Sequence, residues 1–478
     1  MAGAGVARWA SPRFGYDHEV IDLPALSLAA GLCISGLVFA VGVPTLLRRT
    51  WPTERADAPA APGGALLMIL VAGLAARLIL IPSEPMLEDD YQRYLWDGGV
   101  TAAGLSPYAL SPKRASGADR QTKIGALAEA SGAIIDRIAH AGLRTIYPPV
   151  AQAAFALAHK LSPWSLMAWK SVVLVLDVVV LTLVLALLAE IGRSPLWVAL
   201  YWWNPLVLKE LFNSGHMEPV LMAPLLLALL LAIRRRPLAA VVALAVAAGA
   251  KIWPVLLLPL LVRPLLHDRR RLALALGLFA VLMLLWLWPI VIGGLDDSSG
   301  FVAYAAHWRT NSALFPMLER ILGAAGRLLG TAPVWSERSV RVLLALSVGG
   351  FALWQARTPA DEPADLVRRA GMIAAALVLL SPAQYPWYAI WFLPFLPFLP
   401  LRCFLALTVT LPIYYAFFHF NARGAPDVFR HGIVWIIWIP AWIALALDFV
   451  MAGRLARSTP PAETRSNPPE ILPMSHDP

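Results

Sequence analysis

A short acidic and aromatic stretch carries the residues whose types and spacing could support catalysis. Residues 84–98 read Glu-Pro-Met-Leu-Glu-Asp-Asp-Tyr-Gln-Arg-Tyr-Leu-Trp-Asp-Gly. Four side chains at positions i, i+3, i+4 and i+7 would share one helix face; they are Asp90, Arg93, Tyr94 and Asp97. A carboxylate beside an arginine and a tyrosine could act as a positioned base or bind a sugar hydroxyl. A solvated amphipathic helix with a surface ion pair gives the same pattern.

Further charged residues could contact an anion. Lys251 stands inside an otherwise apolar run. A charged group there is costly without a partner, so it is a candidate functional residue. The alternative is a side chain that extends toward water. A later loop carries His307 and Arg309, although a single loop histidine is more often incidental.

A second polar group flanks a short turn between two apolar runs. It consists of Lys209, Glu210, His216 and Glu218. The spacing could bring His216 and Glu218 near one site. Zinc is not indicated, because no further histidine or cysteine cluster completes a ligand set. We therefore expect polar residues at a helix boundary here and no cofactor; a divalent metal is an open alternative that the sequence does not indicate.

Membrane-spanning helices must position these residues. The 478 residues are 59% hydrophobic and only 14% charged, and the mean hydropathy is +0.66. A soluble chain of this length needs more charge to cover its surface. Runs such as 26–47 and 272–292 are long enough to cross a hydrocarbon core of roughly 30 Å, and in lipid they must be helical. We expect an all-α, multi-pass bundle of about 11 to 13 spans in the cell (inner) membrane.

The basic residues fit the same class of protein. The net charge of +9 comes partly from short loops such as 234–236 and 269–271. Arginine clusters in short loops are typical of the cytoplasmic side of membrane proteins. The charge therefore does not indicate nucleic acid binding, and membrane lipids are the expected surroundings.

The chain divides into three parts on composition. Residues 1–24 form a polar leader, residues 25–455 form the transmembrane domain, and residues 456–478 form a tail. The tail is rich in Pro, Ser and Glu, which predicts disorder. Residues 82–147 are the longest polar stretch of the domain and should form an extracytoplasmic catalytic loop. Residues 293–339 should form a second outer loop.

The course of some segments is less direct. Within the first outer loop, helical pieces near 89–103 and 121–141 are too polar to cross and should lie along the membrane surface. Simple alternation from this loop would place 234–236 outside, so one of the earlier runs must fail to cross. The run 237–262 has basic clusters at both ends, and we expect a broken hairpin with its apex at 249–254.

Several short motifs, taken in order, resemble one enzyme superfamily. They are Asp-x-x-x-Tyr at 90–94, Gly-Leu-Ser-Pro-Tyr at 104–108, Tyr-Pro-Pro at 147–149 and Ser-Pro-Ala-Gln-Tyr-Pro-Trp-Tyr at 381–388. Their order and placement resemble the GT-C superfamily of membrane glycosyltransferases. They are most similar to the bacterial polyprenyl-phosphate-mannose-dependent mannosyltransferases of glycosyltransferase family 87 and its neighbours. The resemblance covers most of the chain in layout but only these motifs in residues.

The resemblance implies an activity and a set of roles. A hexosyl group, most commonly mannosyl in this family, would pass with inversion from a polyprenyl-phosphate donor to a lipid or glycan acceptor on the extracytoplasmic face. Asp90 would be the general base, with Asp89 as the alternative. Cationic groups would stabilise the departing phosphate. The expected substrate contacts are Arg93, Tyr94, Asp97, Lys251, His307, Arg309 and Tyr388.

Two other functions fit a polytopic chain. One is a transporter or flippase for a lipid-linked or small solute, and the other is a membrane ligase that transfers whole glycans. A transporter is expected to keep ionisable residues along a path at mid-membrane. Here the acidic residues gather in one outer loop instead. The sequence therefore favours an enzyme of cell envelope biosynthesis.

Overall fold

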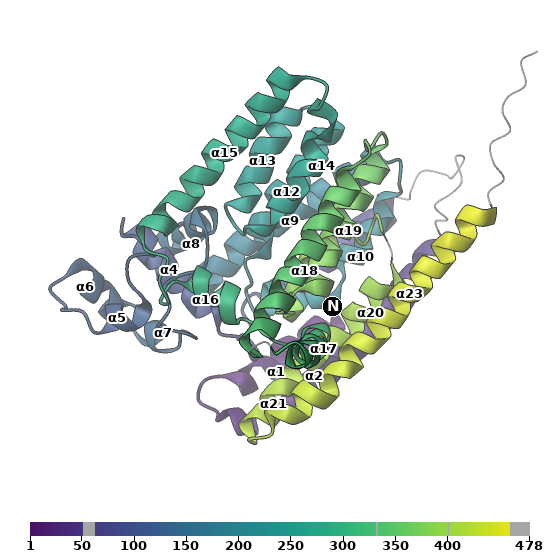
Figure 1. Ribbon diagram of the computed structural model, residues 1–478. Helices are drawn as coiled ribbons and strands as arrows, with labels where there is room; N and C mark the ends of the chain where they lie inside the picture. Colours follow the sequence, from purple (N-terminus) through teal and green to yellow (C-terminus); the bar gives the residue numbers. More distant parts are fainter. Residues whose placement is uncertain (51–62, 331–332, 400, 459–478) are drawn as a thin grey trace, which may run out of the picture.

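The computed structural model describes residues 1–50, 63–330, 333–399 and 401–458, and these residues form a helical bundle (Figure 1). One isolated parallel bridge joins Thr310 and Ala383, and this described part contains no strand. The predicted all-α class is confirmed. The longer helices are α2 (Ala25–Thr50), α3 (Gly63–Leu80), α4 (Asp90–Ala102), α8 (Pro149–Leu161), α9 (Leu166–Glu190), α12 (Glu218–Ile233), α13 (Pro237–Ala248), α15 (Arg269–Ile292), α17 (Leu314–Leu328), α18 (Pro333–Ala356), α19 (Pro363–Leu380) and α23 (Val434–Ser458).

Short helical turns connect these helices. The short α-helices are α1 (Ala2–Ala10), α5 (Pro112–Ser116), α6 (Lys123–Ala130), α7 (Ala133–Asp136), α10 (Ala199–Trp202), α11 (Pro205–Val207), α14 (Leu258–Val262), α16 (Gly300–His307), α20 (Arg402–Thr410), α21 (Ala416–Ala422) and α22 (Pro426–Val428). Irregular helical turns include the π-helix η4 (Leu208–Asn213) and the 3-10 helices η5 (Trp253–Leu257), η7 (Pro386–Trp391) and η9 (Leu411–Tyr415).

Among the described residues, seven helical segments are long and apolar enough to cross a membrane. They are Ala25–Arg49, Gly63–Leu80, Leu166–Glu190, Arg269–Ile292, Glu337–Ala356, Arg402–Ala422 and Pro426–Met451. The chain is therefore a polytopic membrane protein. The number of spans stays a prediction, because several predicted runs fold as shorter or broken helices.

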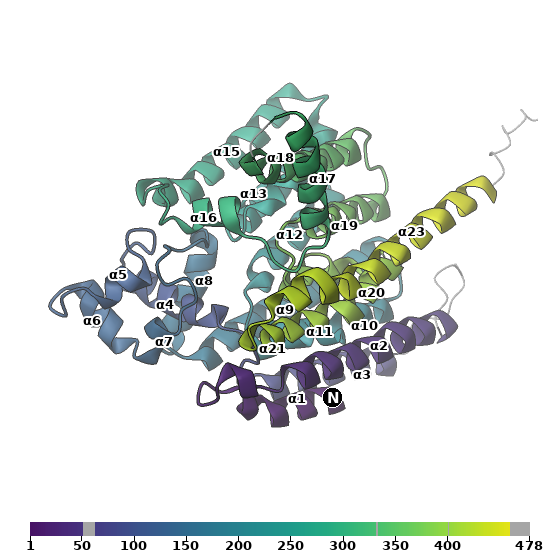
Figure 2. The ribbon, with the colours of Figure 1, turned by 60° about the horizontal axis from the view of Figure 1, so that its bottom comes forward.

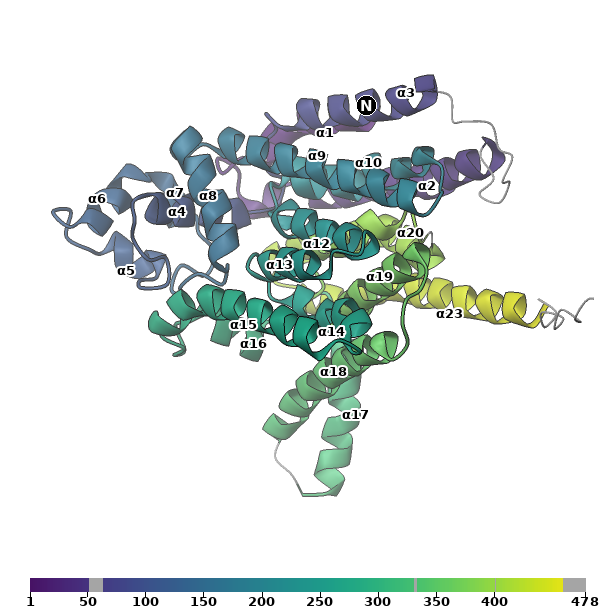
Figure 3. The ribbon, with the colours of Figure 1, turned by 90° about the horizontal axis from the view of Figure 1, so that it is seen from above.

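The helices pack in a continuous bundle. α12 contacts both α9 and α13, and α20 contacts α2 and α23. In Figure 2, α1, α2 and α3 lie along one side of the bundle. Figure 3 shows α17 and α18 as a hairpin that projects from the rest. The polar region of α4 to α7 lies together at one end, where it can cover the ends of several spanning helices (Figure 1).

One short helix removes the conflict in the predicted alternation. α8 has only 13 residues, which is about 20 Å of helix and too short to cross. Phe155 of α8 and Trp169 near the start of α9 both contact the ring of Tyr94. The start of α9 therefore lies at the level of α4. α9 then continues for about 30 Å to Glu190, which pairs with Arg234 at 2.7 Å.

Two further arginines join segments near the ends of helices away from α4. Arg193, just after α9, donates to the backbone carbonyls of Pro397 and Phe398. Arg263 donates to the carbonyl of Arg357 at the end of α18. Because α8 does not cross, α12 ends at the same side of the bundle as α9, which accounts for the position of Arg234.

The run 237–262 is the predicted broken hairpin. α13 ends at Ala248, the chain turns through residues 249–252, and η5 and α14 return along it. The apex carries Lys251, whose ammonium nitrogen lies 2.5 Å from a carboxylate oxygen of Glu218 at the start of α12. The apex therefore reaches the same end of the bundle as α4.

The structure describes the helical pieces predicted in the first outer loop. The piece near 89–103 is present as α4, most of whose residues are buried within the protein, and it packs on α8; its position along the membrane surface stays a prediction. The piece near 121–141 divides into α6 and α7. The polar leader is folded, with α1 packed against α3. The predicted tail of 456–478 lies, after Ser458, outside the described residues.

Candidate active site

A cavity of about 950 Å³ opens beside the start of α4. It is lined by three consecutive acidic residues, Glu88, Asp89 and Asp90, and by Lys251. The remaining wall also includes His18, Glu19 and His140 but is largely aromatic and apolar, with contributions from Phe14, Leu23, Tyr147, Trp253, Tyr304, Leu377, Tyr385, Trp387, Tyr388, Trp391, Tyr414 and Phe418. A polar floor with an apolar wall suits a ligand that joins a charged group to a lipid chain.

The motifs that are far apart in sequence meet at this cavity. Tyr147, Tyr385 and Tyr388 line it. The hydroxyl of Tyr108 donates to the carbonyl of Tyr147 at 2.8 Å, so the motif at 104–108 supports the one at 147–149. The hydroxyls of Tyr304 and Tyr388 lie 2.8 Å apart. The segments that carried the resemblance therefore form one site.

Asn213 holds the loop that precedes the acidic residues. Its side-chain oxygen accepts from the backbone N–H of Met86 at 3.0 Å, and its nitrogen donates to the Ser83 hydroxyl at 3.0 Å and the Glu84 carbonyl at 2.7 Å. Lys170 of α9 donates to the carbonyl of Ser83 at 2.8 Å. These contacts fix the backbone from which the acidic residues project.

The backbone is strained next to the first acid. Leu87 has φ of +58°, a left-handed conformation that a bulky side chain rarely adopts. Such strain persists only where the surroundings hold it, and it gathers at functional sites. The turn at Leu87 lets Glu88 point inward while Asp89 starts α4 as its N-cap residue.

α4 reaches its position through close contact with α8. A Cβ atom at Gly98 would lie 2.5 Å from the carbonyl oxygen of Phe155, so only glycine permits this approach. Tyr94 stacks on Phe155 with ring centroids 4.8 Å apart. The first turn of α4, with Asp90, is thereby held at the cavity.

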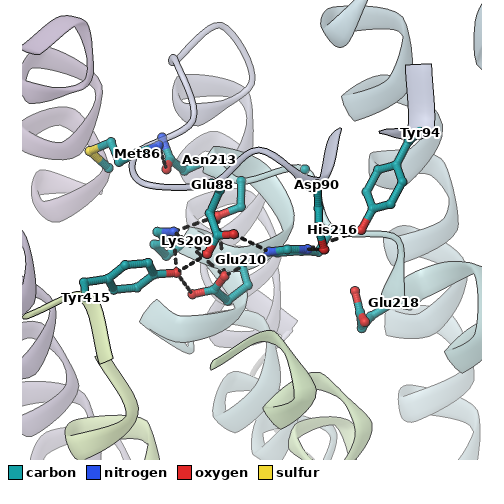
Figure 4. A network of polar contacts seen from close by, with 12 residues as sticks. Met86, Glu88, Asp90, Tyr94, Lys209, Glu210, Asn213, His216, Glu218 and Tyr415 are labelled. Atoms are coloured by element: carbon teal, nitrogen blue, oxygen red, sulfur yellow. Dashed lines mark hydrogen bonds and ion pairs between the residues drawn. The ribbon is translucent and has the colours of Figure 1, made fainter. Parts of the chain in front are cut away.

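A buried polar network lies behind the acidic residues (Figure 4). The hydroxyl of Tyr415 lies 2.8 Å from Oε1 of Glu88 and 2.7 Å from Oε1 of Glu210. Lys209 donates to this hydroxyl at 2.5 Å and to the Ser214 hydroxyl at 2.8 Å. The network joins three segments that are far apart in the sequence.

The π-helix η4 explains why Lys209 and Glu210 both reach this network. A π-turn inserts one residue and redirects neighbouring side chains, and such turns are frequent at functional sites. Here both charged side chains turn into the interior and are nearly fully buried. Gly215, with φ of +80°, then reverses the chain and brings His216 back to the same network.

The imidazole ring of His216 contacts both an aromatic ring and acidic side chains. Its ring stacks on Trp387 at 4.2 Å between centroids, and Trp387 stacks on Tyr385 at 4.3 Å. Nδ1 lies 3.4 Å from the Tyr94 hydroxyl and 3.9 Å from Oδ2 of Asp90. His216 therefore connects the buried network to the cavity.

Burial dominates the electrostatics of the three consecutive acids. Burial raises the pKa of Asp90 to about 7, although the nearby His216 opposes the shift. Burial also raises the pKa of Glu88 to about 7, against the opposing charge of Lys209. The pKa of Asp89 rises to about 6 through burial and the charge of Glu88. Carboxyl groups with such pKa values can exchange protons near neutral pH.

Two of the three acids face different surroundings. Asp90 keeps 33% of its side chain exposed and faces the cavity. Glu88 is only 6% exposed and turns toward Lys209 and His216. Asp90 is thus the better placed to meet a substrate, while Glu88 belongs to the buried network.

The other predicted site residues divide between this cavity and elsewhere. Lys251 and Tyr388 line the cavity, and Tyr94 reaches the network through His216. Arg93 instead donates to the backbone carbonyls of His140 and Leu143, each at 3.1 Å. It holds the outer loop and is not among the cavity-lining residues.

Asp97 shares the helix face of Asp90, but it is buried away from the cavity. It accepts from the amide of Gln152 in α8 at 3.2 Å. Neither Arg93 nor Asp97 is among the residues that line this cavity, because two turns of α4 separate Asp97 from Asp90 and place it against α8. Their contact with a substrate stays a prediction.

His307 and Arg309 also lie outside this cavity. His307 ends α16 and is exposed, while Tyr304 and Trp308 on either side of it line the cavity. Arg309 pairs with Glu319 at 3.1 Å and lines a separate cavity of about 810 Å³ beside α17. The histidine that reaches the candidate site is His216.

Sequence reasoning underrated the group of Lys209, Glu210, His216 and Glu218. A signal was present, because four ionisable residues between two apolar runs are expensive to bury in a membrane protein. Their partner Glu88 is more than 120 positions away, and no local pattern joins them. The expectation of polar residues at a helix boundary therefore missed a buried network.

Comparison with known families identifies the group to which this chain belongs. No curated protein and no solved structure matches the chain. The sequence model of the alpha-(1->6)-mannopyranosyltransferase N-terminal domain matches residues 2–267. This match spans more than half of the chain and contains the acidic loop, η4 and Lys251. The chain therefore belongs to the alpha-(1->6)-mannopyranosyltransferase family and is a membrane mannosyltransferase.

Proposed function

We propose that the protein transfers a mannosyl group from a polyprenyl-phosphate-linked donor to a lipid or glycan acceptor on the extracytoplasmic face, with inversion at the anomeric carbon. Asp90 is the general base. The observation that carries this proposal is the position of Asp90 in a cavity whose floor is charged and whose wall is aromatic and apolar. A lipid-linked sugar phosphate has the same division between a polar head and an apolar chain.

The reaction follows from these positions. The family name indicates an alpha-1,6 linkage, so the nucleophile is a primary hydroxyl at C6 of a mannosyl acceptor. Asp90 takes the proton of this hydroxyl as its oxygen forms a bond to the anomeric carbon. The bond between that carbon and the phosphate oxygen breaks, and the electron pair leaves with the polyprenyl phosphate. Asp89 is the alternative base because it lines the same cavity.

Lys251 is the proposed cation for the departing phosphate. Its side chain is 18% exposed at the cavity, while its partner Glu218 is fully buried. The ion pair holds the ammonium group at the rim, where it can also meet a phosphate oxygen. A positioned cation lowers the barrier because negative charge grows on the phosphate as the bond breaks. Tyr388, whose ring lies 5.2 Å from the Lys251 nitrogen, supports this position.

The extracytoplasmic location is supported by charge. The short loops at the ends of the helices away from the cavity carry Arg193, Arg234 to Arg236 and Arg269 to Arg271. Basic residues in short loops favour the cytoplasmic side. This orientation places the acidic loop and the cavity at the outer leaflet. The family match favours a transferase over the transporter and ligase alternatives.

The test is sugar transfer by purified protein. With a radiolabelled polyprenyl-phosphate mannose and a mannoside acceptor, Asp90→Asn should lower kcat by about 10² to 10⁴, because a positioned base contributes that much. The matched control is Asp136→Asn, which changes an exposed acid of the same outer loop. Wild-type kcat in the Asp90→Asn variant would rule out this assignment of the base.

A further inference from the structure

We propose that Glu88, Glu210 and His216 bind a divalent transition-metal cation, such as Zn²⁺ or Mn²⁺, at the boundary between the cavity, which Glu88 lines, and the buried network behind it. These three residues come from the loop before α4, from η4 and from the turn after it. Each offers one ligand atom, and the three atoms lie within 4.8 Å of one another. The binding itself stands on this geometry, and only the role of the cation in transfer rests on the proposed function.

The distances fit a metal site. Nε2 of His216 lies 3.5 Å from Oε2 of Glu88 and 3.5 Å from Oε2 of Glu210 (Figure 4). Ligands about 2.0–2.1 Å from a tetrahedral zinc ion are separated from each other by about 3.3 Å. Two of the three separations are therefore close to those that a cation between the atoms requires, and the third is within 4.8 Å. A small inward movement of the two carboxylates would complete the contacts.

The histidine nitrogen at the centre of this group lacks a hydrogen bond. His216 is 1% exposed, and its Nε2 is a buried nitrogen without a hydrogen-bond partner among the described residues. Leaving such an atom unsatisfied is costly. The other nitrogen, Nδ1, lies 3.4 Å from the Tyr94 hydroxyl. A proton on Nδ1 leaves the lone pair of Nε2 directed at the two glutamates, as in histidines that bind metals.

The carboxylates are already oriented by a second layer of contacts. The Tyr415 hydroxyl lies within hydrogen-bond distance of Oε1 of both Glu88 and Glu210. The Oε2 atoms of both residues lie 3.5 Å from His216 Nε2, and Oε2 of Glu210 also accepts from the Ser214 hydroxyl at 3.4 Å and lies 3.9 Å from Nζ of Lys209. Outer contacts that fix ligand orientation are a regular part of metal sites.

The charge of the site also calls for a cation. Five carboxyl groups gather here, from Glu88, Asp89, Asp90, Glu210 and Glu218, and two ammonium groups face them, from Lys209 and Lys251. Uncompensated charge is expensive to bury. A phosphate-bearing donor would moreover approach a surface of its own sign. A divalent cation would reduce the excess charge and attract the phosphate.

The donor set selects the class of cation. Two carboxylate oxygens and one imidazole nitrogen suit zinc and manganese better than calcium, which prefers oxygen ligands alone. Three protein ligands leave at least one position open. In the reaction proposed above, a donor phosphate oxygen that approaches past Glu88, the one proposed ligand that lines the cavity, would take this position, and the cation would act on the leaving group as a Lewis acid.

Metal binding can be measured without any donor or acceptor. The full chain is purified in detergent, treated with EDTA, and titrated separately with Zn²⁺ and Mn²⁺ by calorimetry, with bound metal counted by mass spectrometry. We expect one ion per chain for at least one of the two metals. We expect metal affinity to fall by about tenfold to a hundredfold in each of three single variants, Glu88→Gln, Glu210→Gln and His216→Gln. Glu84→Gln, which changes an exposed acid of the same loop, should bind like wild type.

The outcomes separate this inference from the proposed function. Melting temperatures without metal identify variants that fold, and the three ligand variants give three independent chances of a folded one. No saturable binding of either metal by the wild-type chain would overturn the inference, as would wild-type affinity in a folded ligand variant. If the wild-type chain binds neither metal, Lys209 is the cation that compensates the charge of these acids. Metal binding together with full transfer by Asp90→Asn would instead retain the metal site and reject the base.

Discussion

At the scale of single residues, the acids of one short loop are divided between two surroundings. Asp90 meets the cavity, whereas Glu88, two positions earlier, is enclosed by Lys209, His216 and Tyr415. The left-handed backbone at Leu87 and the helix start at Asp89 produce this division. In the proposed reaction Asp90 meets the acceptor, while Glu88 borders both the cavity and the buried network. Neighbouring residues of the same chemical type can therefore serve different steps.

Lys251 gives a prediction at this scale. Lys251→Met removes the ammonium group that is proposed to meet the donor phosphate, and it would leave Glu218 buried without a partner. The change is therefore combined with Glu218→Gln, which keeps the pair neutral. We expect kcat/KM for the polyprenyl-phosphate donor to fall by roughly 10²-fold or more, because a cation at a developing charge contributes on that scale. Steady-state transfer assays measure it.

The comparison variants for Lys251 separate charge from packing. Lys251→Arg keeps the charge and should retain more activity than the double variant. Lys160→Met removes an exposed lysine at the end of α8 and should leave transfer unchanged. An unaltered kcat/KM in the Lys251→Met, Glu218→Gln variant would show that another group meets the phosphate.

At the scale of elements, the site depends on two irregular pieces of backbone between regular helices. The π-helix η4 supplies Lys209, Glu210 and Asn213, and the loop before α4 supplies the acids. Asn213 joins the two pieces by three hydrogen bonds. The regular helices α9 and α12 on either side provide the rigid frame for η4.

Asn213→Ala should loosen the acidic loop without unfolding the bundle. The change removes the three hydrogen bonds and leaves buried polar groups without partners, which costs about 1–3 kcal/mol. We expect faster hydrogen exchange in residues 83–88, measured by mass spectrometry, and a kcat for transfer about tenfold lower. Asn421→Ala, at an exposed position of α21, is the control. Wild-type exchange together with wild-type kcat would mean that Lys170 alone holds the loop.

Some of these elements could be predicted from the sequence and others could not. The period of α4 was visible because helix faces repeat locally, and the hairpin at Lys251 was visible from its basic ends and central Gly-Ala-Lys. The π-turn has no comparable pattern. The contact of Glu88 with Glu210 and His216 is tertiary, so the exclusion of zinc from local spacing considered only part of the possible ligand set. The burial of Asp97 depends on α8, whose apolar run resembles a spanning helix.

At the scale of the whole molecule, the short α8 sets the direction of every later helix. Because α8 turns back at the level of α4, α9 leads away from the cavity and α12 ends on the same side as α9. The arginine loops at 234–236 and 269–271 then share one side, and the acidic loop lies on the other. The family of mannosyltransferases to which the chain belongs does not by itself determine this orientation. Position and charge together give the expectation of a cavity at the outer leaflet.

Cysteine labelling tests this orientation. Cys33 and Cys403 are first replaced by Ala, and single cysteines are then introduced as Ser116→Cys in α5 and Arg270→Cys at the start of α15, both at exposed positions. A membrane-impermeant maleimide added to cells with an accessible outer face of this membrane should label only the cysteine at 116. After permeabilisation it should label both. The reverse order would place the acidic loop in the cytoplasm, where Asp90 would meet donors of the inner leaflet, and an outer-face transfer reaction would be excluded.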